Sequence, residues 1–161
     1  MFLLVLSNKN QEETDKKGMS RWISLTAGIV LFFIAFLKGE LITAFLTFAI
    51  GALCGFVIDC IGVGILKLWK YPRQEFLKKE YFGIVVPAWG VFGMLINLPL
   101  NWIPMPDALS FTMITVSLLV FYELPNIRIG SWKYNVPTWI VISGWFPLIL
   151  ANRFLFLSFS Y

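Results

Sequence analysis

The sequence predicts an all-α fold: a polytopic membrane helical bundle of five transmembrane helices, with two parallel helical-hairpin repeats and one extra N-terminal helix. The first observation behind this prediction is composition, because 58% of the 161 residues are apolar and the mean hydropathy is +0.78. An ordinary soluble domain is 45–50% apolar on average. The other two observations are five long apolar stretches and a motif that occurs twice in one order. This length suits one domain.

Five apolar stretches mark the predicted membrane helices. They are approximately residues 22–37, 41–68, 82–100, 108–122 and 136–150. A membrane-spanning helix needs about 20 residues, so the first and fourth stretches are short for this role. The preceding residues 1–21 are predicted to form a polar N-terminal arm, and residues 22–161 a single transmembrane domain. Met19 is an alternative start within the arm.

The distribution of basic residues predicts how these helices are oriented. Connections on one side, the N-terminal arm included, contain eleven Lys and Arg, whereas those on the other side contain two. Cytoplasmic loops carry this excess in membrane proteins. We therefore expect a multi-pass protein of the cell membrane with a cytoplasmic N-terminus and an external C-terminus. In such a protein, basic residues contact anionic membrane lipid, so nucleic acid is not an expected partner.

A motif of three parts occurs twice: an acid, then Trp-Lys-Tyr, then Val-Pro-x-Trp. The first copy reads Asp59, Trp69–Tyr71 and Val86–Trp89, and the second Glu123, Trp132–Tyr134 and Val136–Trp139. Three elements in one order indicate an internal duplication, with repeat one at about 41–100 and repeat two at about 108–150. The predicted orientation makes both hairpins run the same way, so they are parallel repeats.

The two acids are the candidate catalytic residues. Asp59 precedes Trp69 by ten residues, about 15 Å of helix, which places it inside the hydrocarbon zone. A charge there costs about 2.5 kcal/mol or more, so the carboxyl either makes an interhelical hydrogen bond or is a functional acid. Pro125 should end or distort the helix near Glu123, leaving a helix end or a broken helix that lines a cavity. Both alternatives remain open.

If the repeats are related by an axis, Asp59 and Glu123 approach each other and serve as acid and base. The motif's aromatic residues have two interpretations. They either anchor the helices at headgroup level or wall a pocket in which they bind substrate and stabilise a carbocation. These candidate substrate-binding residues are Trp69, Tyr71, Trp89, Trp132, Tyr134 and Trp139.

The sequence gives no support for metal-dependent or cofactor-dependent chemistry. Histidine is absent, and Cys54 and Cys60 lie on different faces of one helix, so neither a metal site nor a cofactor is expected. Gly51 and Gly55 form a Gly-x-x-x-Gly pattern, which lets another helix approach closely and would permit a homo-oligomer.

Acids in short duplicated membrane hairpins, followed by aromatic residues, resemble the small integral-membrane carotenoid enzymes, the lycopene cyclase domains and carotenoid hydratases. The resemblance covers Asp59 to Trp89 and Glu123 to Trp145, although the chain lacks the Pro-x-Glu-Glu sequence of the cyclases. It implies that Asp59 and Glu123 protonate a polyene end without redox change. We therefore expect a membrane enzyme that acts on an isoprenoid or other lipid through carboxylate acid–base chemistry. The alternative is a non-enzymatic membrane protein, either a small transporter or an assembly subunit.

Overall fold

The computed structural model describes residues 22, 24–72, 74–102, 107–128, 130 and 132–160. The predicted N-terminal arm, with Met19, lies outside these residues. The described chain is mostly helical, which confirms the all-α prediction. A first helix at Ser24–Leu37 is followed by α2 (Leu41–Asp59), α3 (Val86–Trp102), α4 (Asp107–Leu118), α5 (Leu124–Arg128) and α6 (Thr138–Ser160).

Three π-helical segments extend these helices: η1 (Cys60–Ile65), η2 (Tyr81–Val85) and η3 (Leu119–Glu123). Pro87 follows η2 and Pro125 follows η3, and a proline cannot donate to the carbonyl four residues before it. A π-helical turn accommodates the missing bond without ending the helix. Of the two outcomes expected at Pro125, the structure shows distortion, because helix continues to Arg128.

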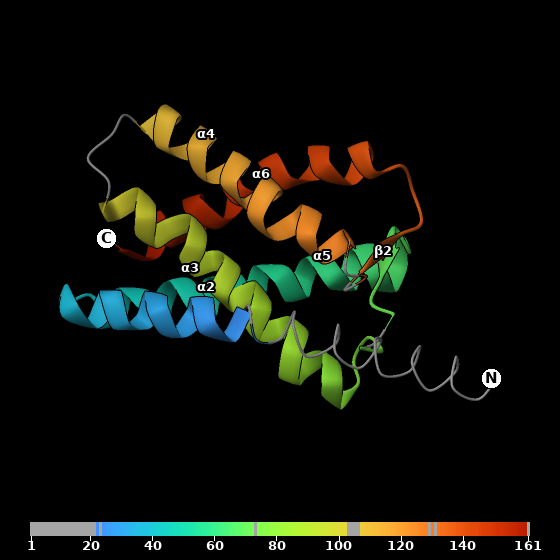
Figure 1. The fold of residues 1–161 in the computed structure, drawn as a ribbon, viewed down its shortest axis with the longest axis horizontal. Helices are drawn as coiled ribbons and strands as arrows, with labels where there is room; N and C mark the ends of the chain where they lie inside the picture. The colour runs from blue at the N-terminus through green and yellow to red at the C-terminus, as the bar shows by residue number, and fades with distance from the viewer. Residues whose placement is uncertain are drawn as a thin grey trace, which may run out of the picture.

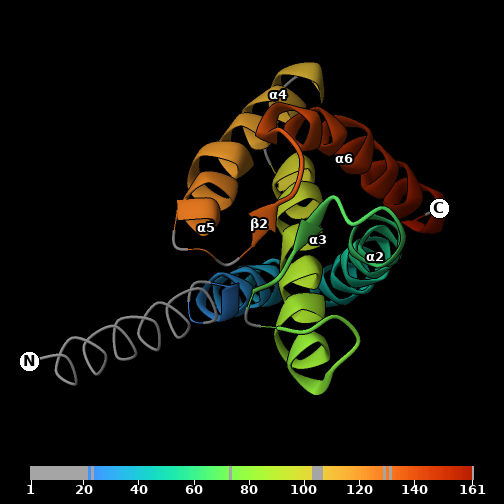
Figure 2. The same cartoon turned by 90° about the vertical axis from the view of Figure 1, so that its right-hand side faces the viewer.

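The helices run back and forth along one axis, as Figure 1 shows. At one end lie two short strands, β1 (Trp69–Lys70) and β2 (Lys133–Tyr134), which pair antiparallel. Trp69 pairs with Tyr134 and Lys70 with Lys133, so the Trp-Lys-Tyr triplets of the two repeats are joined to each other. Seen along the axis, α3 lies centrally between the other helices (Figure 2). The ladder therefore holds the ends of the two hairpins together.

Helices α2 and α3 make the most extensive helix contact in the described chain. A Cβ atom added to Gly51 would lie 2.6 Å from the Cα of Gly93, and one added to Gly55 would overlap the Trp89 side chain. Only glycine permits this approach. The Gly51 and Gly55 face is thus occupied within the chain, which corrects the expectation that it is available for a homo-oligomer.

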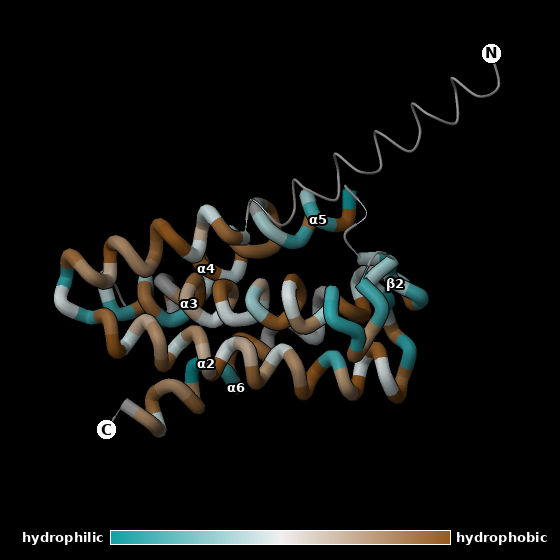
Figure 3. Tube along the Cα trace, turned by 90° about the horizontal axis from the view of Figure 1, so that it is seen from below, coloured by the Kyte–Doolittle hydropathy of each residue, from teal (hydrophilic) through white to brown (hydrophobic). Residues whose placement is uncertain are grey.

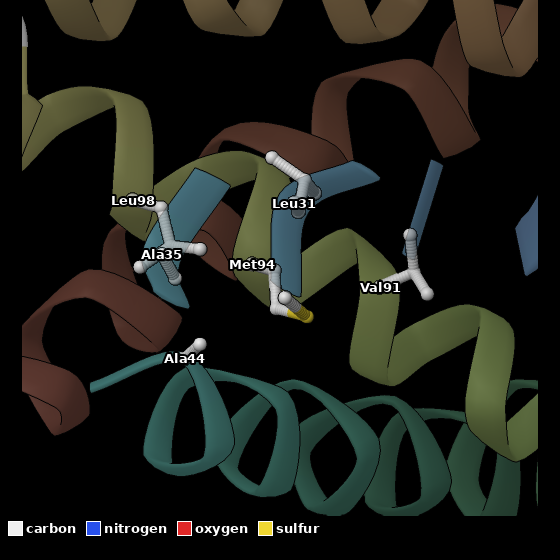
Figure 4. Packing of buried hydrophobic residues seen from close by; sticks show 6 residues of the cluster. All are labelled: Leu31, Ala35, Ala44, Val91, Met94 and Leu98. Atoms are coloured by element: carbon white, nitrogen blue, oxygen red, sulfur yellow. The ribbon is translucent and has the colours of Figure 1, made fainter. Parts of the chain in front are cut away.

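The two apolar clusters lie on either side of α3. One joins the first helix, α2 and α3 through the residues shown in Figure 4: Leu31, Ala35, Ala44, Val91, Met94 and Leu98. The other joins α3, α4 and α6 through Phe92, Ile96, Leu118 and Ile149. Because α3 contributes to both clusters, it packs against helices from both halves of the chain.

Two helical stretches, Leu41–Ile65 and Tyr81–Trp102, are long and apolar enough to cross a membrane by length and composition. Ser24–Leu37 and Pro147–Phe159 are shorter apolar helices. Figure 3 shows apolar residues along most of the helical length and a gathering of hydrophilic ones around α5 and β2. This distribution favours association with a membrane.

Candidate functional site

Asp59 ends α2 with a fully buried side chain that accepts hydrogen bonds from four aromatic residues. Trp69 Nε1 donates to Oδ1 at 3.1 Å, and Trp89 Nε1 donates to Oδ2 at 2.9 Å. The Tyr71 hydroxyl lies 2.8 Å from Oδ1 and 3.0 Å from Oδ2, and the Tyr81 hydroxyl donates to Oδ2 at 2.8 Å. Both carboxyl oxygens are therefore satisfied within the protein.

Trp69 reaches Asp59 because the chain turns back after η1. The helix ends at Ile65, and Lys67 has a positive φ of 53°. Gly62 leaves the space that the Trp69 ring fills, since a Cβ there would overlap the indole. The expected 15 Å of continuous helix between Asp59 and Trp69 is thus wrong: ten residues of sequence end in a direct hydrogen bond. Trp69 and Tyr71 face inward instead of serving only as surface anchors.

Tyr71, like Trp69, belongs to the connection between the two long apolar helices Leu41–Ile65 and Tyr81–Trp102. Burial raises the pKa of its phenol well above the ordinary value, and the neighbouring Asp59 raises it further. The phenol consequently keeps its proton at physiological pH and remains a donor to the carboxyl.

Glu123 occupies the corresponding position of the second repeat, at the end of η3, and is 1% exposed. Trp132 Nε1 donates to its Oε1 at 3.2 Å, as the equivalent Trp69 does to Asp59. The Oε2 atom is buried and has no hydrogen-bond partner. Glu123 therefore repeats the carboxyl–indole contact of the first copy but lacks most of its donors.

The two carboxyls are linked through aromatic rings. Tyr71, which donates to Asp59, packs edge-on against Trp132, which donates to Glu123, with ring centroids 6.5 Å apart. Within the described residues no hydrogen bond joins Asp59 to Glu123. Each carboxyl thus has its own hydrogen-bond donors, and the pairing of Asp59 and Glu123 as acid and base stays a prediction.

A cavity of about 700 Å³ lies beside this cluster. Its walls include five of the six predicted substrate-binding residues: Trp69, Tyr71, Trp89, Trp132 and Tyr134. Trp139 is not among the lining residues; it lies in the first turn of α6 with 70% of its surface exposed. Neither Asp59 nor Glu123 lines the cavity. The carboxyls stand behind the aromatic wall, where they hold indole and phenol groups in place.

The cavity wall is nearly all apolar and aromatic. Ser24 and Gln74 provide its aliphatic polar side chains, and none of its described lining residues is Lys, Arg, Asp or Glu. Over the described ranges, no Lys or Arg forms an ion pair with Asp59 or Glu123. The site therefore combines two buried carboxyl groups that have no basic partner in the described part of the chain.

Sequence reasoning missed Tyr81, which donates to Asp59, and Tyr122, which lines the cavity. Tyr81 immediately precedes the third apolar stretch, a position that is equally typical of an aromatic residue at the membrane interface. It also missed Asn152, whose Oδ1 accepts a 2.7 Å hydrogen bond from Asn97 of α3. The sequence marks Asn97 as polar in an apolar stretch, but its partner lies 55 residues away.

Metal-binding residues do not gather in this part of the chain: the described positions contain no group of three or more His, Cys, Asp or Glu that could hold an ion. Cys54 and Cys60 are both free thiols.

The chain matches no protein-family model, no curated protein and no solved structure. The fold and the site together define an all-α protein with an aromatic-walled apolar cavity and a buried carboxyl behind that wall in each of two repeats.

Proposed function

We propose that this protein is an integral membrane protein that spans the membrane five times and binds an isoprenoid or other lipid-like molecule. The observation that carries the proposal is the cavity of about 700 Å³, walled by aromatic side chains. Cavities that hold organic ligands are typically 300–1,000 Å³ in volume, mostly apolar, with few polar groups. An apolar molecule fits this wall because it requires few hydrogen bonds from it.

The outer surface supports the membrane part of the proposal. Large apolar side chains project outward along α2 and η1, with Ile42 85% exposed, Leu53 63% and Ile65 72%. A water-soluble protein rarely exposes a contiguous apolar face of this length. Lipid chains would cover it at no hydrophobic cost, and the uneven distribution of Lys and Arg supports a cytoplasmic N-terminus.

Acid–base chemistry on the bound lipid is the second part of the proposal. Asp59 already accepts from four donors, so it offers no free oxygen to a reacting group. Glu123 retains one oxygen without a partner, which makes it the better candidate for proton transfer. Because Glu123 does not line the cavity, its contact with substrate requires the Trp132 ring to move.

Identification of the bound lipid tests the proposal directly. Protein purified in a mild detergent is extracted with organic solvent, and the extract is analysed by mass spectrometry. A Gly144→Phe variant should lose the lipid, since Gly144 lines the cavity and has open space where a side chain would project. Ser143→Phe is the matched control because Ser143 is exposed and is not among the lining residues. Equal lipid content in all three proteins, at the level of empty micelles, would exclude the cavity as a lipid site.

Assays with the identified lipid then distinguish an enzyme from a transporter. Glu123→Gln is expected to abolish its turnover while its binding persists, because the amide cannot donate and reclaim an acidic proton. Full turnover by this variant would exclude acid–base chemistry at Glu123. Movement of the lipid or a solute between the two faces of a vesicle, with no chemical change, would instead support a transporter.

A further inference from the structure

We propose that the ligand of this cavity carries a positive charge: it is a lipophilic cation, such as a quaternary ammonium or phosphonium group attached to an apolar body. The inference rests on the proposed function, which supplies the cavity and its apolar ligand. It adds the charge of that ligand, which follows from the carboxyl groups behind the aromatic wall.

The site lacks a balancing positive charge among the residues that the structure describes. Asp59 and Glu123 are 0% and 1% exposed, and no Lys or Arg among the described residues pairs with either. Buried charges in proteins are normally paired. The four side chains around Asp59 all donate to it, an arrangement that matches the ionised carboxylate, which only accepts. A cation in the adjoining cavity would supply the missing opposite charge.

The aromatic wall transmits this negative charge to the cavity. The indole N–H groups of Trp69 and Trp89 point at Asp59, and that of Trp132 points at Glu123, while all three residues also line the cavity. The edge of an aromatic ring is positive and its face negative, so an anion at the N–H edge increases the electron density of the face. Such faces attract cations, and walls of several rings bind quaternary ammonium groups.

The opposite end of the bundle contains the same arrangement with a cation in place. Trp102 Nε1 donates to Glu40 Oε2 at 2.8 Å, and Lys38 Nζ lies 5.5 Å from the centroid of the Trp102 ring. A carboxylate at the N–H edge and a cation at the face of one indole thus occur together in this chain. The indoles of the cavity have the carboxylate, and no Lys or Arg occurs among the described residues that line the cavity with them.

Two ions of nearly identical size and shape test the charge of the ligand: tetraphenylphosphonium and tetraphenylborate. Each is titrated into the full-length protein in a neutral detergent by calorimetry, with protein-free micelles as the blank. We expect the phosphonium to bind about tenfold more tightly or better, as desolvated cation–π contacts of several rings would give. Gly144→Phe should weaken its binding, which locates the ion in the cavity.

Substitutions then test which residues cause the preference for the phosphonium over the borate. Glu123→Gln and Asp59→Asn should each reduce the ratio of the two affinities, and Trp89→Leu should weaken phosphonium binding. Trp139→Leu should change neither value, because Trp139 is exposed and outside the cavity. If Asp59→Asn fails to fold, the ratio of phosphonium to borate affinity is still compared between Glu123→Gln and the wild type. That comparison shows whether a buried carboxyl causes the preference for a cation.

Equal affinities for the two ions, both reduced by Gly144→Phe, would contradict the proposal that the ligand is a cation. The cavity would still be supported as a binding site. No binding of either ion, together with no extracted lipid, would overturn the proposed function as well. Preference for the borate would also exclude a cationic ligand.

Discussion

Asp59 and Glu123 occupy equivalent positions in the two copies of the motif, yet their carboxyl oxygens are satisfied very differently. Four donors surround Asp59, whereas one donor to Glu123, Trp132, is found among the described residues. The sequence singles out both acids, because a carboxyl in an apolar helix needs a partner. It could not reveal Tyr81 as a donor, since that contact depends on two helices meeting across 22 residues of chain.

This difference predicts that amide substitution destabilises the protein more at Asp59 than at Glu123. Asp59→Asn replaces one acceptor oxygen by an amide group, and in either orientation the indole of Trp69 or Trp89 loses its acceptor. A buried donor left without an acceptor costs about 1–3 kcal/mol. We expect a loss of that size in the free energy of unfolding, measured by SDS titration.

Glu123→Gln is the control, because its amide oxygen can still accept from Trp132 and its nitrogen replaces an oxygen that has no partner. Its loss should stay below about 1 kcal/mol, since no existing hydrogen bond is removed. Equal losses in the two variants would contradict the distinct environments of these carboxyls.

At the scale of elements, the two repeats differ in how closely their helices pack. In the first, Gly51 of α2 and Gly93 of α3 bring the backbones together, which positions Trp89 beside Asp59. In the second, Gly144 of α6 follows Trp139 by five residues, where Gly93 follows Trp89 by four, and nothing lies within 4 Å of a Cβ added to Gly144. The open space borders the cavity, so the looser packing of the second repeat helps to create the site.

Alanine at Gly93 should therefore destabilise the protein, whereas alanine at Gly144 should not. Gly93→Ala places a methyl group 2.5 Å from the Thr47 carbonyl oxygen and 2.6 Å from the Gly51 Cα. Overpacking of this kind costs about 1–3 kcal/mol. Gly144→Ala meets no atom and gains up to about 1 kcal/mol of helix propensity.

The midpoint of thermal unfolding in detergent, followed by circular dichroism, provides the comparison. It should fall for Gly93→Ala and hold or rise for Gly144→Ala. A fall of similar size in both variants would show that α6 packs as tightly as α3.

At the scale of the whole molecule, the β1–β2 ladder joins the repeats at one end, and the connection between Leu37 and Leu41 lies at the opposite end of α2 (Figure 1). If the N-terminus lies in the cytoplasm, as we propose, the ladder end faces the cytoplasm and Lys38 faces the outside of the cell. The basic connection before α3, with Lys78 and Lys79, then lies on the cytoplasmic side.

Single cysteines at two exposed lysines test this orientation. In a chain whose Cys54 and Cys60 are replaced by Ala, Lys38→Cys should react with a membrane-impermeant maleimide in intact cells. Lys78→Cys, whose native side chain is 61% exposed, should react only after permeabilisation. The reverse pattern would invert the topology, and labelling of both in intact cells would exclude the five-span arrangement.

The sequence by itself determined the helical class, the apolar stretches, the repeated motif and the two acids, because composition and spacing are local properties of the chain. It also selected five aromatic residues that line the cavity. Only the tertiary structure decided that the Trp-Lys-Tyr triplets pair with each other, that Trp139 lies outside and that neither carboxyl faces the cavity. The physical reason is that these outcomes depend on turns at Lys67 and on the close approach of glycines in separate helices, which bring together residues far apart in sequence.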